Sequence, residues 1–311
     1  MSVLIITFVI LVFIKLIVIN LFFPGFIYNL VIALERKSAR LSKKFTTVDN
    51  HTICYLEGGS GETILLIHGY NGDKDNWTRM AKYLTGKYHV ISIDDPGFGE
   101  SSYYFEKSYT IQNQAERINS LCEKLGIDKC HVAGNSMGGA IAGYFASAYP
   151  ERVITLGLFD AGGVSAVKKS EYFSTLDKNK NRLLCYNASD YVGLLDLAFT
   201  RPPFTTAPIR KYLGKKNCKR KDINIKIFDD IMADFTALEN NLSKIEAETL
   251  IIWGNDDRIL DISAVSVFEK GIKKARSVIF KNCGHVPQME RPRKTANTYL
   301  HFIGEISYQA G

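Results

Sequence analysis

Five residues, Gly134-Asn135-Ser136-Met137-Gly138, have the spacing of a serine nucleophile in a tight turn. They follow an apolar run at 131–133 and precede small residues at 139–143, so we expect a strand, a sharp turn and a helix in that order. Such a turn strains the serine backbone, and the two flanking glycines avoid the clash that side chains would cause. The helix that follows directs its positive end toward the reacting atoms. We therefore predict that Ser136 is a nucleophile.

A serine hydroxyl needs a general base, and the base needs a group that fixes its tautomer. In folds with this turn the three residues come in the chain order serine, acid, histidine. Among six histidines, His285 lies in a loop just past the last predicted strand, and we predict that it is the base. The predicted acid is Asp257, which follows another strand end; the alternatives are Asp256, Asp160 and Asp261.

Acyl transfer also needs two preorganised N–H donors for the oxyanion. The amide after the nucleophile, that of Met137, is one expected donor. The other is expected from the loop after an earlier strand, where Gly69 lets the backbone turn and the amide of Tyr70 follows. We expect the neighbouring His68 to stabilise this loop rather than to act as a second base.

The N-terminal end is strongly apolar, with 18 Val, Leu, Ile or Phe among its first 23 residues. Lys15 opposes membrane insertion by only about 3 kcal/mol, less than the apolar side chains contribute. We predict a transmembrane anchor at 1–23 rather than a signal peptide, because no basic start or cleavage site accompanies it. Range 24–44 is expected to be an interfacial and basic linker. Its five Lys and Arg residues predict a catalytic domain that faces the cytoplasm.

Short apolar runs then alternate with helical patterns, which predicts an α/β fold with a mostly parallel sheet buried on both faces. Strands are expected at 52–56, 62–68, 88–93, 130–135, 153–159, 249–253 and 277–280, and helices at 108–125, 137–148 and 294–306. The Gly-rich segment 58–61 is expected to be the turn of a hairpin between the first two strands.

The alternation lapses between residue 160 and the strand at 249, a stretch too long for a loop. We predict a helical cap at 163–245, between two parts of the core at 45–162 and 246–311. From 163 to 244 the cap holds 15 Lys or Arg and nine Asp or Glu. Its basic cluster at 215–221 is either a solvated loop or a patch against acidic lipid headgroups. Apolar cap residues that could line an acyl path, or simply form the cap core, are Leu194, Leu195, Leu197, Phe199 and Phe204.

Composition excludes several other classes of protein. The 311 residues carry a formal net charge of +7 without a dense arginine face, so no nucleic acid is expected as a partner. The six cysteines are scattered and form no C-x-x-C pair, which gives no support to a metal site and favours buried, reduced thiols.

Five segments in the right order resemble α/β-hydrolases: HGYNGDKDNW (68–77), DDPGFGESS (94–102), AGNSMGG (133–139), IIWGNDDR (251–258) and NCGHVPQMERPRKTA (282–296). With the apolar N-terminus, the chain looks most like the membrane-anchored monoacylglycerol lipases (α/β-hydrolase domain type 6) and related bacterial lipases. The resemblance implies the α/β-hydrolase fold with a cap over an acyl pocket. It also implies a serine esterase of lipids that uses Ser136, Asp257 and His285, with Tyr70 and Met137 as oxyanion donors and no cofactor.

Two alternatives remain open at this point. Serine-dependent C–C bond hydrolases of meta-cleavage products have similar motifs, but they usually place a tryptophan after the catalytic histidine, where this chain has Val286. A membrane-tethered binding module without catalysis is the alternative from another class. The sequence does not indicate chain length, head group or oligomeric state.

Overall fold

One sheet organises the molecule. The computed structural model describes residues 5–8, 20–176 and 181–310, with side chains described to residue 306 at the C-terminal end. Within these ranges eight strands pair in the order β1-β2-β4-β3-β5-β6-β7-β8. β1 pairs with β2 and β2 with β4 antiparallel, whereas all later neighbours are parallel. The strands are β1 Ser42–Val48, β2 His51–Gly58, β3 Thr63–Ile67, β4 His89–Ile93, β5 Cys130–Asn135, β6 Val153–Phe159, β7 Glu248–Gly254 and β8 Ala275–Phe280.

The central strands are buried along nearly their whole length, as their continuous apolar runs predict. Every residue of β5 is buried, and β3, β6 and β7 each have only one partly exposed residue. A strand that is covered on both faces has no side that faces solvent, so its sequence does not alternate between apolar and polar residues. The predicted parallel core of the sheet is therefore confirmed.

The predicted hairpin at 58–61 is wrong. β2 and β3 are not neighbours, because β4 lies between them and pairs with both. Gly59 and Gly61 do have positive φ, as a tight turn requires, but here the turn leads into a crossover. The hairpin of this sheet is instead β1–β2, which the sequence analysis missed; its two turn residues, Asp49 and Asn50, have φ of 48° and 66°. Positive φ at both positions suits a two-residue hairpin turn.

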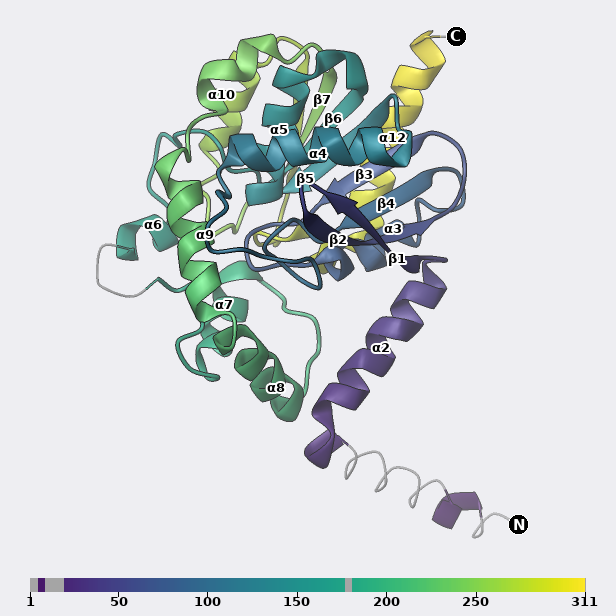
Figure 1. The fold of residues 1–311 in the computed structure, drawn as a ribbon, viewed down its shortest axis with the longest axis vertical. Coiled ribbons are helices and arrows are strands. Elements are labelled where there is room, and N and C mark those ends of the chain that lie inside the picture. Colours follow the sequence, from purple (N-terminus) through teal and green to yellow (C-terminus); the bar gives the residue numbers. More distant parts are fainter. Residues whose placement is uncertain (1–4, 9–19, 177–180, 311) are drawn as a thin grey trace.

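Helices cover both faces of the sheet (Figure 1). On one face lie α4 (Ile111–Leu125), α5 (Met137–Ala148) and α10 (Ala264–Gly271), whose apolar residues join one core cluster. On the other face, α3 (Thr78–Ala81) and α12 (Pro292–Ala310) pack with Trp77 of the 3-10 helix η1 (Lys74–Trp77). α4 shows why these segments are helical: its apolar residues recur at helical spacing, Thr110 caps its start and Gly126, at φ 68°, ends it.

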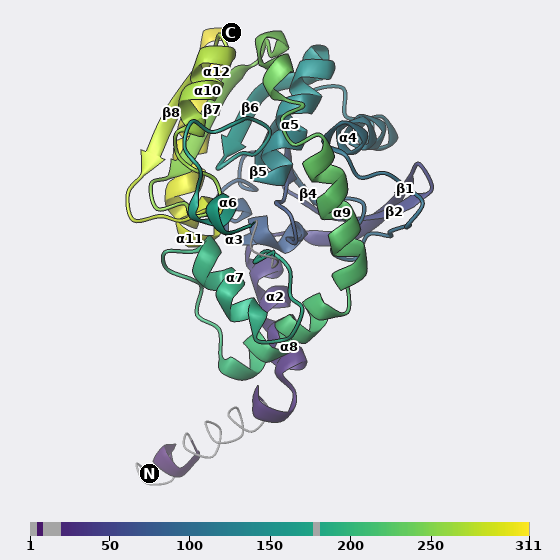
Figure 2. The same ribbon diagram turned by 90° about the vertical axis from the view of Figure 1, so that its left-hand side faces the viewer.

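The segment between β6 and β7 is helical. It contains α6 (Glu171–Thr175), α7 (Asp190–Ala198), α8 (Ala207–Cys218), α9 (Lys221–Ala233) and the 3-10 helix η3 (Glu239–Lys244). Figures 1 and 2 both place α8 at one end of the molecule beside α2 (Pro24–Ser38). The two helices touch closely, since a Cβ on Gly25 would lie 2.7 Å from the Tyr212 ring.

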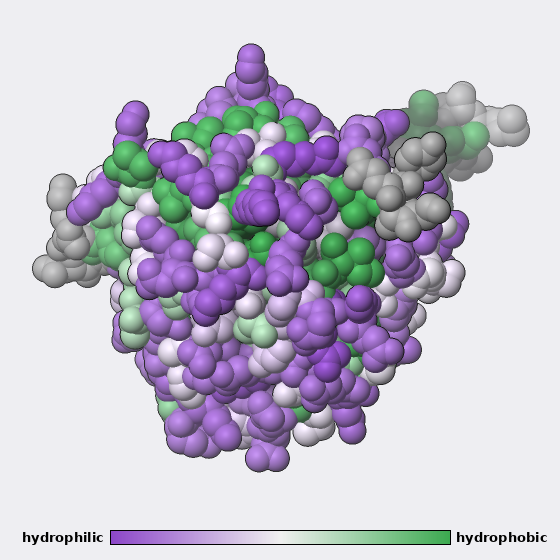
Figure 3. Space-filling view, turned by 90° about the horizontal axis from the view of Figure 1, so that it is seen from above, coloured by the Kyte–Doolittle hydropathy of each residue, from purple (hydrophilic) through white to green (hydrophobic). Residues whose placement is uncertain are grey.

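The predicted anchor at 1–23 lies mostly outside the described residues. Helical turns are described at 5–8 and 20–22, ahead of α2. In the described part of the chain, no helix combines the length and the apolar run needed to cross a bilayer. The face of the molecule seen from above is largely hydrophilic with smaller hydrophobic areas (Figure 3).

Candidate active site

Ser136 occupies the strained turn that its sequence predicts. It stands between the last residue of β5 and the first of α5, at φ 57° and ψ −119°. The flanking glycines are required sterically: a Cβ on Gly134 would lie 2.0 Å from the Gly138 carbonyl oxygen, and one on Gly138 would lie 2.3 Å from the Ile67 carbonyl oxygen. A non-glycine residue at positive φ carries a conformational cost that the surrounding structure must hold in place. The predicted strand–turn–helix is therefore confirmed.

Asp257 and His285 meet at the same edge of the sheet, where β7 and β8 end. His285 Nδ1 lies 2.7 Å from Asp257 Oδ2, and both side chains are almost fully buried. The other carboxylate oxygen of Asp257 accepts hydrogen bonds from the backbone N–H groups of Ile259, at 2.7 Å, and Leu260, at 3.1 Å. Ser136 and His285 both line one cavity of about 270 Å³. The arrangement fits a serine, an imidazole and a carboxylate in series.

The loop after β3 lies against the serine. A Cβ on Gly69 would be 3.1 Å from Ser136 Cβ, and Tyr70 lines the cavity with Ser136. Met137 begins α5, so its N–H is one of the four that have no partner within a helix. The Tyr70 hydroxyl donates to the Asn224 carbonyl, at 2.7 Å, which ties this loop to cap helix α9. His68 accepts from the Asp95 N–H, at 3.1 Å, and its other ring nitrogen faces the Gly69 carbonyl oxygen, as expected for a loop-stabilising residue.

The alternative acids have other surroundings. Asp256 faces the Thr200 hydroxyl at 3.4 Å, and Asp261 accepts from the Ser263 N–H at 2.9 Å. Asp160, which directly follows β6, does lie beside the Asp257–His285 pair, but it is Asp257 that accepts the hydrogen bond of the imidazole.

Two polar residues that the sequence analysis missed hold the histidine loop in place. Asn135, inside the serine motif, donates to the carbonyl oxygens of Phe159 and His285, both at 2.9 Å. The Glu290 carboxylate accepts from the backbone N–H groups of Gly284, Thr200 and Arg201, all at 3.1 Å, and so joins this loop to the cap. No fixed spacing in the sequence predicts these two roles, because each side chain forms hydrogen bonds with the backbone of other segments of the chain.

The cavity extends from the serine toward the end of the molecule where α2 and α8 meet. Its walls include Tyr28, Ile32 and Glu35 of α2 and, from the cap, Leu194, Leu195, Phe199, Leu213, Lys216 and Arg220. Leu197 is buried and Phe204 is 92% exposed, so neither of these predicted acyl-path residues lines it. A second cavity, of about 50 Å³, also touches Ser136 and is almost wholly apolar; Phe173, Phe228 and Phe235 are among its walls.

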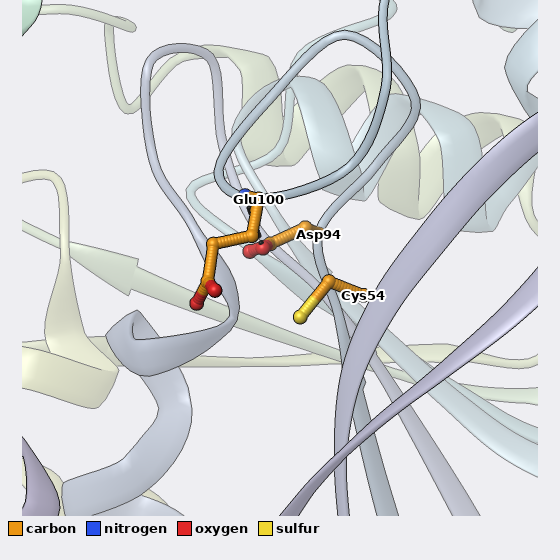
Figure 4. Close-up of side chains that lie close together, drawn as sticks. All are labelled: Cys54, Asp94 and Glu100. Carbon is orange, nitrogen blue, oxygen red and sulfur yellow. Dashed lines mark hydrogen bonds between the residues drawn. The ribbon is translucent and has the colours of Figure 1, made fainter.

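A second cluster of titratable groups, Cys54, Asp94 and Glu100, lies beside the sheet (Figure 4). The buried ammonium group of Lys74 lies 2.8 Å from Asp94 Oδ2 and 2.9 Å from Glu100 Oε1, so a lysine balances this charge. Partial burial raises the pKa of Glu100, but hydrogen bonds from Lys43 and Lys74 outweigh it and lower this pKa to about 2. The cluster therefore works as a buried ion pair that ties η1 to the end of β4.

Lys74→Met is expected to lower the free energy of unfolding by about 3–5 kcal/mol, because it leaves the fully buried Asp94 without its counter-charge. Urea denaturation followed by circular dichroism measures the change. Lys43→Met is the matched control, since its pair with Glu100 is exposed and we expect a change below about 1 kcal/mol. Equal effects of the two substitutions would contradict the assignment.

Known proteins match this chain along most of its length. A family model described as the alpha/beta hydrolase fold matches residues 62–183. Lipase 1 of Psychrobacter immobilis is 34% identical over 286 residues, which cover 90% of this chain and 89% of the lipase. Monoacylglycerol lipase ABHD6 of Bos taurus is 30% identical over 292 residues, covering 87% and 85% of the two chains.

Solved structures agree with these relatives. The crystal structure of a membrane phospholipase A, a bacterial virulence factor, has 41% identity and a TM-score of 0.90 over 99% of both chains. Hydrolases of meta-cleavage products are more distant: one from Rhodococcus has 22% identity, which shows the shared fold alone. The chain therefore belongs to the α/β-hydrolase family and is a serine hydrolase of the lipase and esterase type, acting on esters.

Proposed function

We propose that this protein hydrolyses carboxylic esters of lipids, with Ser136 as nucleophile, His285 as general base and Asp257 as the group that orients the imidazole. One observation carries the proposal: His285, which lies 2.7 Å from Asp257, is in the wall of a cavity that Ser136 also lines. Lone buried pairs of this kind also occur in structural networks, but here the strained serine stands at the same edge of the sheet.

The reaction follows from these positions. His285 takes the proton of Ser136, whose oxygen attacks the ester carbonyl, while the amides of Tyr70 and Met137 hold the oxyanion. The alcohol leaves with the proton from His285, and an acyl-enzyme remains. Water, deprotonated by His285, then attacks the acyl carbon and releases the acid. No cofactor and no metal takes part in these steps.

The two cavities that meet at Ser136 suit the two parts of such a substrate. We assign the acyl chain to the apolar cavity beside Phe235 and the alcohol part to the larger cavity, whose walls include polar groups from α2 and the cap. Burial of apolar surface drives the binding of an acyl chain, whereas a head group needs water or polar partners.

Phe235→Ala is expected to raise the ratio of long-chain to short-chain kcat/KM by about tenfold, because it lengthens the small apolar cavity. Assays with p-nitrophenyl esters of increasing chain length measure this ratio. Phe105→Ala, which removes an exposed ring outside both cavities, is the control. An unchanged ratio in Phe235→Ala would place the acyl chain elsewhere.

The preferred candidate for the lipid is a monoacylglycerol, as in the ABHD6 relative. A glycerophospholipid is the second candidate, and the cap wall of the larger cavity favours it. Lys216 and Arg220 lie there, and Arg220 bonds to the Gly97 carbonyl oxygen and stacks over Tyr103, with no carboxylate paired to it among the residues that the structure describes. The similar membrane phospholipase A acts on the second class.

A direct test compares monoacylglycerol and phosphatidylglycerol as substrates of the full-length protein. Labelling with a fluorophosphonate, followed by peptide mapping, locates the nucleophile, which we expect at Ser136. Substitution of Lys216 and Arg220 by glutamine is expected to lower phospholipid turnover more than monoacylglycerol turnover. Labelling at another residue, or no turnover of either lipid, would refute the proposed function.

The proposed division of the chain is an anchor at 1–23, a linker at 24–44, core parts at 45–162 and 246–311, and a cap at 163–245. Three observations support membrane attachment at the α2 end. Phe22 and Phe23, just before α2, and Phe26 in its first turn are exposed; α2 lines the larger cavity; and Thr206 of the cap bonds to Asn20 at 2.9 Å. Substrate would then enter close to the bilayer.

We propose that the catalytic domain faces the cytoplasm, because basic residues follow the apolar segment. Protease treatment of sealed inverted vesicles is expected to digest the domain, and treatment of intact spheroplasts is expected to spare it. The opposite pattern would reverse the orientation without affecting the catalytic proposal.

A further inference from the structure

A second aspartate lies behind the proposed triad. Asp160 directly follows β6, next to the strand that leads to Asp257, and its N–H continues the sheet by donating to the Ile252 carbonyl oxygen at 2.9 Å. Its backbone has a positive φ of 43°, and the residue is fully buried. One carboxylate oxygen accepts the Gly254 N–H at 2.9 Å. The side chain is thus fixed in a buried position, where ionisation of a carboxyl group costs free energy because the charge is removed from water.

The other oxygen of Asp160 has no donor among the described residues. A carboxylate oxygen of Asp160, one of Asp257 and a ring nitrogen of His285 all lie within 4.8 Å of one another. Two ionised carboxylates in such a buried site repel, and both can only accept hydrogen bonds. One proton between them replaces this repulsion by a hydrogen bond.

The surroundings decide which carboxyl group holds that proton. Asp257 accepts from two backbone N–H groups and contacts His285, whereas Asp160 accepts from one backbone N–H. Burial raises the pKa of Asp160 well above its usual range, and the charges of Asp257 and of Glu290 on α11 (Pro287–Glu290) raise it further. These surroundings favour Asp160 as the carboxyl group that holds the proton.

We propose that Asp160 is a positioning residue: a neutral carboxylic acid that donates a hydrogen bond to the Asp257 carboxylate and so holds it against His285. The proposal rests on the triad of the proposed function and adds a fourth member to it. A neutral donor steadies Asp257 without placing a second negative charge near the imidazole.

The proposal predicts that activity falls as the pH rises through the pKa of Asp160. Below its raised pKa, Asp160 is protonated and donates to Asp257. As the pH rises through that pKa, the proton is lost, the hydrogen bond becomes a repulsion between two buried charges, and the Asp257–His285 geometry loosens. The wild type is therefore expected to lose kcat on the alkaline side, at constant substrate and in a protein that is still folded.

Two substitutions separate this role from backbone strain, because asparagine and glycine both tolerate positive φ. Asp160→Asn keeps an N–H donor toward Asp257 and an acceptor for Gly254, so we expect kcat within about threefold of wild type and no alkaline loss. Asp160→Gly removes the donor, and we expect kcat to fall by about tenfold to a hundredfold with little change in KM. Equal impairment of both variants, or an alkaline loss that persists in Asp160→Asn, would overturn the proposal.

Infrared difference spectroscopy of the full chain gives a readout that does not depend on turnover or on Asp160→Gly folding. Wild type minus Asp160→Asn at neutral pH is expected to show the carbonyl stretch of a protonated carboxylic acid. A carboxylate band in its place would refute a neutral Asp160. If Ser136→Ala retained activity, the proposed function would fail, but this band would still report on Asp160 separately.

Discussion

Ser136→Ala is expected to lower kcat for a p-nitrophenyl ester by about 10⁶-fold, because it removes the oxygen that attacks the ester carbonyl and carries the acyl group in the proposed mechanism. The substitution leaves the fold intact, since a serine at the tip of the turn contributes strain rather than packing. Steady-state hydrolysis measures the loss, and the thermal midpoint should not fall. The remaining activity would come from the oxyanion donors and substrate binding alone.

Ser147→Ala is the matched control. Ser147 lies on the same helix, α5, and its hydroxyl donates to the Tyr144 carbonyl oxygen at 2.8 Å, away from both cavities. We expect this variant to keep wild-type kcat and fluorophosphonate labelling, both of which Ser136→Ala should lose. Comparable activity in the two variants would mean that another group carries the acyl transfer.

The positions of the three proposed catalytic residues could be predicted because each follows a strand that its own sequence identifies. Parallel strands end at one edge of the sheet, so Ser136 after β5, Asp257 after β7 and His285 after β8 are brought together by topology. The strand runs are apolar enough to be recognised without knowledge of their neighbours. The prediction of the central fold succeeded for the same reason.

The order of the strands could not be predicted in the same way. The Gly-rich segment before β3 has the local signature of a hairpin turn, but β3 is buried and needs a partner on each side, which β4 and β5 supply. Pairing between strands that are distant in sequence decides such cases, and a local pattern does not record it. Asp49-Asn50 is a local turn signal, but the strand before it, β1, contains mostly polar and exposed residues, so its sequence does not identify it as one strand of a hairpin.

The side chains that hold the site in place could not be predicted from the sequence either. Asn135, Glu290 and Asp160 act on the backbone or on carboxylates of other loops, and their roles depend on distances across the sheet edge. The place of α2 in the cavity wall has the same origin, because it results from contacts with α8. The sequence offers Asp160 only as an alternative to Asp257, whereas in the structure the two lie close together.

Asp257→Asn is expected to lower kcat by about 10⁴-fold while the fold stays intact. The backbone N–H groups of Ile259 and Leu260 both donate to Oδ1, so the new amide must place its oxygen there. Its NH₂ group then faces His285 Nδ1, where Oδ2 lies in the wild type. This nitrogen must become an acceptor, so the ring proton moves to the other nitrogen, which can no longer take the proton of Ser136.

Asp256→Asn provides the control for that argument. It changes the neighbouring carboxylate in the same way, but Asp256 faces Thr200 rather than the imidazole, so we expect kcat within about twofold of wild type. The pair of variants therefore measures the tautomer of His285 rather than the loss of one charge near the site. A loss in Asp256→Asn as large as that in Asp257→Asn would show that net charge at this edge of the sheet, and not the orientation of the imidazole, sets the rate.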